Sequence, residues 1–182
     1  MAPPATAMGL STFFVGRQMC RLPECLSLAA LAQRLVDIPA SLSLRTAQGF
    51  VITSAGHPQS PRSEETVVEV RDYDPVRHSC LAIGLLEPGI DTPIHWMAYR
   101  TDELTRAAAF VREAGRIDGV EYAATRHPPG SFQEAMEIAA LAKRTGRPAG
   151  AQGKGLLVKA SSAGELERAV LGLWGLQGEA KA

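Results

Sequence analysis

Short runs of alternating apolar and polar residues recur between longer segments of helical periodicity, and this succession constrains the fold most. Residues 41–46 (SLSLRT) and 49–55 (GFVITSA) alternate with a period of two, which predicts a β-hairpin with Gly49 in its turn. Residues 67–73 and 79–85 predict two further strands. Taken in order with the helices, these runs favour an α/β domain in which layers of helices flank a largely antiparallel sheet.

Four segments carry the signals of helices. Cys25 to Asp37 has apolar positions spaced for an amphipathic helix, which Pro39 ends. Two further helices begin at capping boxes, in which a serine is followed three residues later by a glutamate. These boxes are Ser131 with Glu134 and Ser162 with Glu165. The predicted helices cover residues 25–37, 92–100, 131–144 and 162–176.

The remaining segments are shorter. Residues 119–125 and 155–160 predict strands, and residues 56–66 predict a polar loop. Residues 107–111 (AAAFV) are compatible with the end of a helix or with a short buried strand.

Composition limits the partners. Among 182 residues, 46% are hydrophobic and 21% are charged, as in an ordinary soluble globular protein. Nineteen basic residues balance 19 acidic ones, so the chain offers no field that would attract nucleic acid or an anionic membrane. No apolar run is long enough to predict a membrane span.

The length predicts one domain, residues 26–182, after an N-terminal extension of residues 1–25. The first ten residues are rich in proline and alanine, which predicts that they are flexible. Three cysteines without a disulfide pattern favour a reducing compartment, and we expect the cytoplasm. They are Cys20, Cys25 and Cys80, and we expect structural roles for them.

The stretch DTPIHW at residues 91–96 raises a functional question. Asp91 or Thr92 is placed to cap the helix that follows, with Pro93 in its first turn. His95 is placed on a helix entering the core, where a buried histidine with satisfied hydrogen bonds is the simplest interpretation. Asp91 and His95 would equally suit two halves of one site.

Five stretches in the same order resemble the class II aldolase/adducin family over residues 26–175. SLSLR and GFVITSAGHP resemble the first hairpin and phosphate loop, and VVEVRDYDP resembles the next strand. DTPIHWMAYR is similar to the helix with the family's acidic residue, and AAAFVRE to the strand with two metal-binding histidines. GSFQEAMEIAALA and GKGLLVKASSAGELERAV resemble the closing helix, the strand of the third histidine and the last helix. The resemblance implies a three-layer α/β fold around a mostly antiparallel central sheet.

The family's chemistry requires a divalent metal, usually zinc, held by three neutral imidazoles, while an acidic residue moves protons. By the resemblance, the acidic position falls on Asp91 and the three histidine positions fall on Phe110, Arg112 and Lys154. Phenylalanine has no lone pair, arginine stays protonated, and lysine must lose its proton before it can ligate. We therefore expect no metal and no other cofactor.

The phosphate-binding positions of the family are depleted as well. An asparagine falls on Ser41, a turn hydroxyl falls on Ala55, and the two serines before the acid fall on Gly89 and Ile90. Each change removes a donor that would meet a phosphate oxygen, so a sugar phosphate is not the expected ligand. The pocket positions that remain are Ser41, Ser54, Gly56, His95 and Phe110.

Two functions stay open on these grounds. The first is a non-catalytic or ligand-binding domain, for which the adducin head is the family's precedent. The second is a metal-free lyase, of aldol-cleavage or decarboxylation type, acting on a small carbonyl or carboxylate compound. In it Asp91 is the acid/base, Arg112 binds charge, and Lys154 forms a Schiff base. The simpler interpretation of these residues is that Arg112 pairs with Asp91 or Glu113 and that Lys154 is solvated.

A third alternative is a conventional metal-dependent aldehyde-lyase with other ligands, such as His57, His95 and His127. The resemblance also implies a homo-oligomer, typically a cyclic tetramer. Residues 11–16 (STFFVG) and the apolar helix around Trp174 are candidate contact surfaces, although both would equally suit the core.

Overall fold

The computed structural model of the protein describes residues 9–55, 64–112, 116–124, 126–151 and 153–179. Its helices are α1 (Pro23–Arg34), α2 (Thr92–Thr101), α3 (Phe132–Thr145) and α4 (Ala163–Glu179), with a short 3₁₀ turn at Glu64–Thr66. Its strands are β1 (Ser11–Gly16), β2 (Ala40–Arg45), β3 (Phe50–Thr53), β4 (Val67–Asp74), β5 (Ser79–Ile83), β6 (Ala107–Arg112), β7 (Glu121–Ala123), β8 (Ala149–Ala151) and β9 (Gly155–Ala160).

All the strands join one sheet in the order β1-β5-β4-β3-β2-β6-β9-β8-β7. The two outermost pairs, β1–β5 and β7–β8, are parallel, and every other neighbouring pair is antiparallel. The largely antiparallel sheet predicted from the sequence is therefore confirmed.

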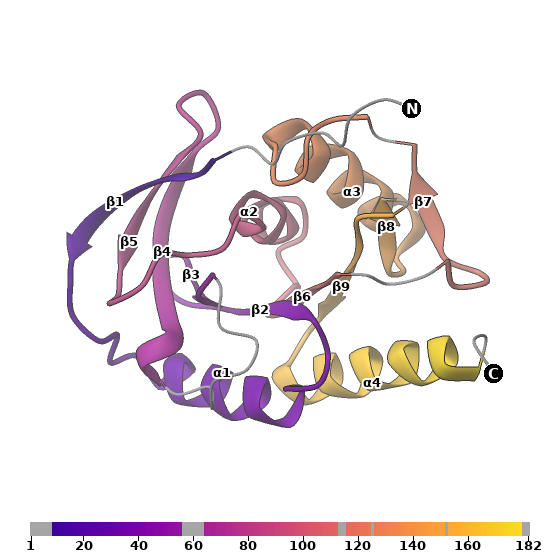
Figure 1. The fold of residues 1–182 in the computed structure, drawn as a ribbon, viewed down its shortest axis with the longest axis horizontal. Coiled ribbons are helices and arrows are strands. Elements are labelled where there is room, and N and C mark those ends of the chain that lie inside the picture. The colour runs from indigo at the N-terminus through magenta and orange to yellow at the C-terminus, as the bar shows by residue number, and fades with distance from the viewer. Residues whose placement is uncertain (1–8, 56–63, 113–115, 125, 152, 180–182) are drawn as a thin grey trace.

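Helices cover both faces of this sheet, as Figure 1 shows: α2 and α3 lie on one side and α1 and α4 on the other. Each face has its own core. Leu42, Leu156 and Leu166 belong to the cluster beneath α1 and α4, whereas Ile94 and Leu157 belong to the cluster beneath α2 and α3. Because Leu156 and Leu157 are neighbours in β9, the alternation along one strand supplies both cores. The predicted three-layer architecture is confirmed.

The strand β6 resolves the ambiguity over residues 107–111. It pairs with β2 on one side and β9 on the other, in the middle of the sheet. Helices cover both of its faces, so every residue from Ala107 to Val111 is buried. A strand in this position has no solvated face, and so it shows no alternation in the sequence.

The predicted hairpin forms from β2 and β3, and its turn is closed by the Thr46 amide, which donates to the Gly49 carbonyl at 3.0 Å. Gly49 is required by close packing rather than by a special turn conformation. A Cβ atom at this position would collide with the backbone carbonyl oxygen of Val70 in the adjacent strand β4.

Local signals located the helix starts well. Ser131 Oγ accepts from the Glu134 amide at 3.2 Å, and Ser162 Oγ accepts from the Glu165 amide at 3.2 Å. The serine caps of both predicted boxes are confirmed, whereas each glutamate accepts from the amide one residue before the serine, Gly130 and Ser161. The helix predicted at residues 25–37 instead begins with Pro23 in its first turn and ends at Arg34.

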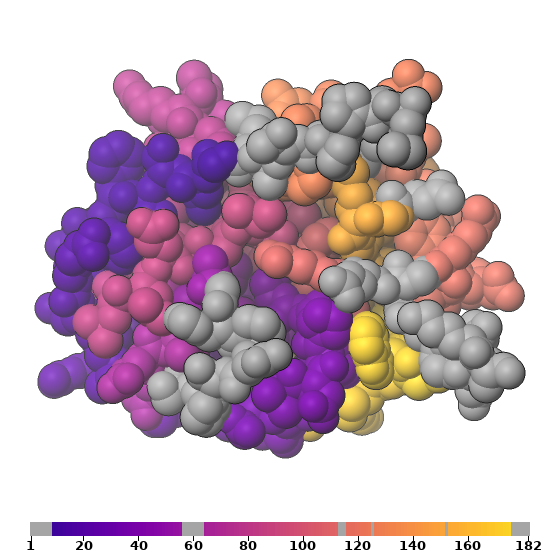
Figure 2. All heavy atoms as spheres, in the orientation of Figure 1, coloured from indigo at the N-terminus to yellow at the C-terminus, as the bar shows by residue number. Residues whose placement is uncertain are grey.

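Two strands were not predicted. β8 is short and consists of alanine and glycine only. β1 lies in the segment that was assigned to the N-terminal extension. β1 lies at one edge of the sheet, and Figure 2 shows it (indigo) at the molecular surface. Phe13 and Val15 are 59% and 66% exposed there. The assignment of residues 1–25 to an extension separate from the domain stays a prediction.

Residues 56–63 of the predicted polar loop lie outside the described residues. The strand predicted at residues 119–125 is confined to Glu121–Ala123, at the other edge of the sheet. Trp174, a candidate contact residue, is partly buried against the core beneath α1 and α4. In the part of the chain that is described, no helix is both long and apolar enough to cross a membrane.

Candidate functional site: a buried polar chain beside Asp91 and Arg112

Asp91 stands at the N-terminus of α2, but its side chain does not cap the helix. Asp91 is thus the N-cap residue, as predicted, but the expected capping hydrogen bond from its side chain is not formed. Its backbone carbonyl accepts from the amides of Ile94 and His95, and the Thr92 amide donates to the Gly89 carbonyl, so the carboxylate turns to a partner outside the helix. The reason is a stronger partner, because a guanidinium is within reach of the carboxylate.

That partner is Arg112, the last residue of β6. Arg112 Nε donates to Asp91 Oδ2 at 2.9 Å, and Arg112 Nη2 donates to the same oxygen at 2.6 Å. The Asp91 side chain is 4% exposed, whereas the Arg112 side chain is 45% exposed. The pair therefore joins a buried carboxylate to a cation that still reaches the surface.

Ser41 links this ion pair to the interior. It lies on β2, opposite Phe110 of β6. Its hydroxyl donates to Asp91 Oδ2 at 2.9 Å and lies 2.9 Å from His95 Nε2. Asp91 Oδ2 thus receives three donors, and Ser41 carries the connection towards α2.

His95 is fully buried and bonded at both ring nitrogens. Its Nδ1 lies 2.7 Å from Ser43 Oγ, and Ser43 Oγ lies 2.7 Å from Tyr99 Oη. Burial, and after it the nearby charge of Arg112, lowers the pKa of His95 from 6.5 to about 3. His95 is accordingly a neutral imidazole, as the sequence predicted for a buried structural histidine. Burial likewise raises the pKa of Tyr99, so its hydroxyl stays protonated.

Lys154 finds a different carboxylate. Its Nζ lies 3.0 Å from Glu134 Oε1 and also donates to the backbone carbonyl of His127. The Glu134 side chain is 2% exposed, and its other oxygen accepts from the Gly130 amide at 2.7 Å. The structure therefore joins Asp91 to Arg112 but gives the Lys154 ammonium its own buried counter-ion. Lys154 is not simply solvated.

The other predicted pocket residues are dispersed. Phe110 is buried, and Gly155 leaves the room that its ring occupies, since a Cβ there would lie 2.5 Å from Phe110 Cζ. Ser54 follows β3 and forms an isolated antiparallel bridge with Pro88. Gly56 and the histidine at position 57 lie outside the described residues.

The residues at this site do not fit a divalent metal. The positions implied for imidazoles carry an aromatic ring, a guanidinium bound to Asp91 and an ammonium bound to Glu134. Neither cation has a free lone pair. The described residues contain no cluster of three or more histidine, cysteine or acidic side chains that would suit an ion.

Sequence reasoning missed Ser43 and Tyr99. Two signals identify them in retrospect. Ser41 and Ser43 are two apart on a strand, so they share a face, and His95 and Tyr99 are four apart on a helix, so they share a stripe. What the sequence did not reveal is that this face and this stripe meet.

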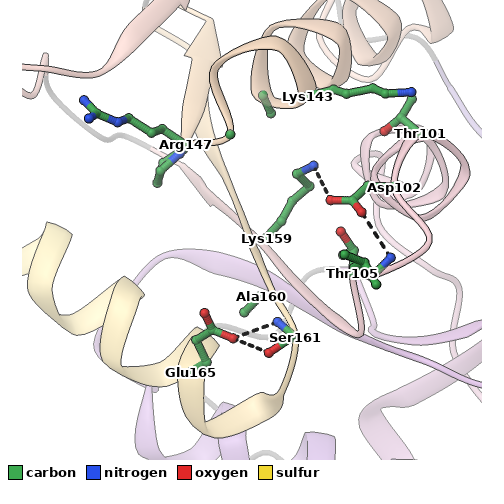
Figure 3. A pocket seen from close by; sticks show the side chains of 13 residues that line it. Thr101, Asp102, Thr105, Lys143, Arg147, Lys159, Ala160, Ser161 and Glu165 are labelled. Atoms are coloured by element: carbon green, nitrogen blue, oxygen red, sulfur yellow. Dashed lines mark hydrogen bonds and ion pairs between the residues drawn. The ribbon is translucent and has the colours of Figure 1, made fainter.

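A separate cleft of about 400 Å³ lies at the opposite ends of β6 and β9, where Ala107 pairs with Ala160. Figure 3 shows the charged side chains that line it, among them Asp102, Lys159 and Glu165. Lys159 Nζ lies 2.9 Å from Asp102 Oδ2, and this hydrogen bond holds the pKa of Asp102 below its ordinary value. Glu165 accepts from Ser161, and Arg147 points away from Lys159 (Figure 3). None of the predicted site residues lines this cleft.

No family model and no curated protein matches the sequence. Solved structures do match the fold. An L-fuculose-1-phosphate aldolase from Thermus thermophilus has a TM-score of 0.61 at 18% identity, covering 88% of this chain and 93% of that one. A sugar-phosphate aldolase from Thermotoga maritima has a TM-score of 0.64 at 11% identity, covering 85% and 92%. An aldolase II superfamily protein from Pseudomonas syringae has a TM-score of 0.65 at 15% identity, covering 87% and 75%.

Proposed function

We propose that this chain, which has the class II aldolase fold, is a ligand-binding module for a small carboxylate and not a metal-dependent aldolase. Fold alone does not carry activity, so the argument rests on the site. The observation that carries it is the ion pair of Arg112 with Asp91, in which the guanidinium is still 45% exposed.

One edge of the Arg112 guanidinium is not used by Asp91. Its Nε and Nη2 both face Asp91 Oδ2, which leaves the edge formed by Nη1 and the second Nη2 hydrogen. Among the described residues, no bond is made from Nη1. A carboxylate fits such an edge with two parallel hydrogen bonds.

The charge balance supports a singly charged ligand. Arg112 is offset by Asp91, and Lys154 is offset by Glu134, so these four groups carry no net charge. A phosphate dianion would meet no excess of positive charge here. Glycine and isoleucine also stand where the resemblance implies phosphate-binding serines, at Gly89 and Ile90.

The test is titration calorimetry with pyruvate and with lactate as carboxylate probes. Wild-type protein is expected to bind at least one of them, and Arg112→Gln is expected to weaken that binding at least tenfold. Arg144→Gln is the matched control, because Arg144 is also ion-paired, 3.4 Å from Glu121, but lies at the surface. Absence of binding by wild-type protein, or equal binding by Arg112→Gln, would overturn the proposal.

The alternative of a metal-free lyase has one observation in its favour, the contact between Asp91 and Arg112. It also needs a Lys154 amine that is free to attack a carbonyl, whereas Lys154 Nζ is engaged by the Glu134 carboxylate at 3.0 Å and by the His127 carbonyl. Borohydride reduction in the presence of pyruvate distinguishes the two functions. We expect no change in protein mass, whereas a reduced adduct on Lys154 would establish the Schiff base that the lyase requires and would favour that function.

The conventional metal-dependent aldehyde-lyase receives less support. Both ring nitrogens of His95 are engaged by Ser41 and Ser43, and His127 Nε2 lies 3.4 Å from the Glu137 carboxylate. Elemental analysis of purified protein is expected to find no stoichiometric metal. A stoichiometric metal that is lost together with activity on chelation would establish this third function instead.

The tetramer and the cytoplasmic location remain part of this proposal. Phe13 and Val15, exposed on the edge strand β1, are the residues we assign to a subunit contact. Light scattering after size-exclusion chromatography measures the assembly. If Phe13→Ser leaves the molar mass of the assembly unchanged, the assignment of β1 to the subunit contact is wrong.

A further inference from the structure

Five side chains form one continuous buried hydrogen-bonded chain from Asp91 to Tyr99. The contacts run from Asp91 Oδ2 to Ser41 Oγ (2.9 Å), to His95 Nε2 (2.9 Å), and from His95 Nδ1 to Ser43 Oγ (2.7 Å) and Tyr99 Oη (2.7 Å). No member is more than 8% exposed. Because these groups are buried, each hydrogen has to find its acceptor within the chain.

The direction of the hydrogen bonds follows from Asp91. A carboxylate paired with a guanidinium only accepts, so the single hydrogen of the Ser41 hydroxyl points to Asp91. Ser41 Oγ is then an acceptor towards His95, and His95 Nε2 must carry the ring proton.

The rest of the chain is determined in turn. A neutral imidazole with its proton on Nε2 has an acceptor at Nδ1, so Ser43 donates to Nδ1. Ser43 has then used its only hydrogen, and Tyr99 donates to Ser43 Oγ. All four contacts are satisfied, and every hydrogen points towards Asp91.

The opposite tautomer satisfies fewer contacts. With the proton on Nδ1, Ser41 would donate to Nε2, and its oxygen would face Asp91 Oδ2 at 2.9 Å without a hydrogen between them. Ser43 would donate to Tyr99, and the buried Tyr99 hydroxyl would have no acceptor within the chain. Buried groups left without partners are costly, so this arrangement is excluded. Because the pKa of His95 is lowered to about 3, its ring is neutral at every pH well above that value.

From this direction we infer that Asp91 presents its second oxygen, Oδ1, as an acceptor, and that the ligand is a 2-hydroxy carboxylate. This inference rests on the proposed function and adds the second group of the ligand. Oδ2 accepts from Ser41 and from two nitrogens of Arg112, and within the described part of the chain no hydrogen bond reaches Oδ1. The ligand carboxylate occupies the free Arg112 edge, and its neighbouring hydroxyl donates to Asp91.

The backbone beside the pair carries no side chain at Gly89, and a Cβ there would meet Arg112 Nη2 at 3.9 Å and the Asp91 amide nitrogen at 4.0 Å, which are ordinary contact distances. A 2-oxo acid has the same size and the same carboxylate, but its carbonyl oxygen would face the Asp91 acceptor without a hydrogen. A site with a fixed acceptor rejects an analogue that lacks the donor.

The binding experiment compares lactate with pyruvate by titration calorimetry on the full chain. Lactate is expected to bind at least tenfold more tightly than pyruvate. Equal affinities, or tighter binding of pyruvate, would overturn the hydroxy-acid inference while leaving the carboxylate-binding function intact. If neither probe binds, the proposed function fails and the ligand class fails with it.

The direction of the chain has a test of its own that needs no ligand. Nitrogen-15 NMR of the histidine side chains reads the tautomer of His95, and the proton is expected on Nε2. A proton on Nδ1 would overturn the inferred direction even if both acids bind.

Ser43 and Tyr99 act here as positioning residues, because they reach Asp91 only through His95 and Ser41. Ser43→Ala is expected to mix the His95 tautomers and to reduce the preference for lactate to threefold or less. Ser43→Thr keeps the hydroxyl and is expected to keep both the tautomer and the preference. If the Ser43→Ala protein folds and retains the full preference for lactate, the buried hydrogen-bonded chain does not contribute to ligand selection.

Discussion

Arg112 directs two nitrogens at one oxygen of Asp91, with Nε at 2.9 Å and Nη2 at 2.6 Å from Oδ2. The carboxylate is buried, and the cation that neutralises it comes from the end of a central strand. By the family resemblance, Arg112 stands where a metal-binding histidine is expected. By that resemblance, a cation takes the place of a metal ligand and is bound to the residue at the position implied for proton transfer.

Removing the guanidinium should destabilise the fold. Arg112→Gln leaves the 4%-exposed Asp91 carboxylate with only Ser41 as a donor. We expect the free energy of unfolding to fall by about 1–2 kcal/mol, less than for a fully buried pair because Arg112 is partly solvated. Urea denaturation measures the change. The double variant Asp91→Asn/Arg112→Gln should recover part of the loss, and an additive double variant would contradict the coupling.

The buried imidazole should make stability depend on pH. The folded pKa of His95 is about 3, well below its ordinary value of 6.5, so the unfolded chain binds the extra proton between these limits. Stability is therefore fully present above pH 6.5 and is lost as the pH falls towards 3. The His95 contribution changes by up to about 1.4 kcal/mol per pH unit.

This contribution is measured as the difference between wild-type protein and His95→Gln in urea denaturation from pH 7 to pH 4.5. The wild-type curve should fall more steeply than that of the variant, since glutamine has no proton to take up. Parallel curves would show that His95 titrates normally in the folded protein.

Gly155 should not tolerate a side chain. A Cβ at this position would lie 2.5 Å from Phe110 Cζ and 2.9 Å from the Val111 carbonyl oxygen, in the middle of the sheet. Gly155→Ala is expected to lower the free energy of unfolding by about 1–3 kcal/mol through overpacking. The control is Gly172→Ala in α4, where nothing lies within 4 Å and helix propensity predicts a gain of up to about 1 kcal/mol. A neutral Gly155→Ala would contradict the contact with Phe110.

Histidines restored at the three implied positions should recreate a metal site. Phe110 and Arg112 share one face of β6, and Gly155, which follows Lys154, pairs with Arg112. The triple variant Phe110→His/Arg112→His/Lys154→His is expected to bind zinc stoichiometrically and to melt at a higher temperature with zinc than without it. Wild-type protein should show no such shift. A folded triple variant without zinc affinity would contradict the positions taken from the resemblance.

Local signals in the sequence were sufficient for much of the fold. The capping boxes at Ser131 and Ser162 depend on atoms within three residues, and the hairpin of β2 and β3 depends on a short turn. The segment at 107–111 was ambiguous because a strand covered on both faces has no alternation. β1 was missed because its pairing with β5 connects residues far apart in the chain.

The sequence by itself determined the layers of helices around an antiparallel sheet, and the residues at the positions that the resemblance implies for metal ligands predicted that no metal is held there. Only the tertiary structure decided which partner each charge meets. The Asp91 carboxylate pairs with Arg112, and Lys154 pairs with Glu134. The reason is that a buried charge is stabilised by the nearest opposite charge in space, and the folded sheet, not the order of residues, sets that distance.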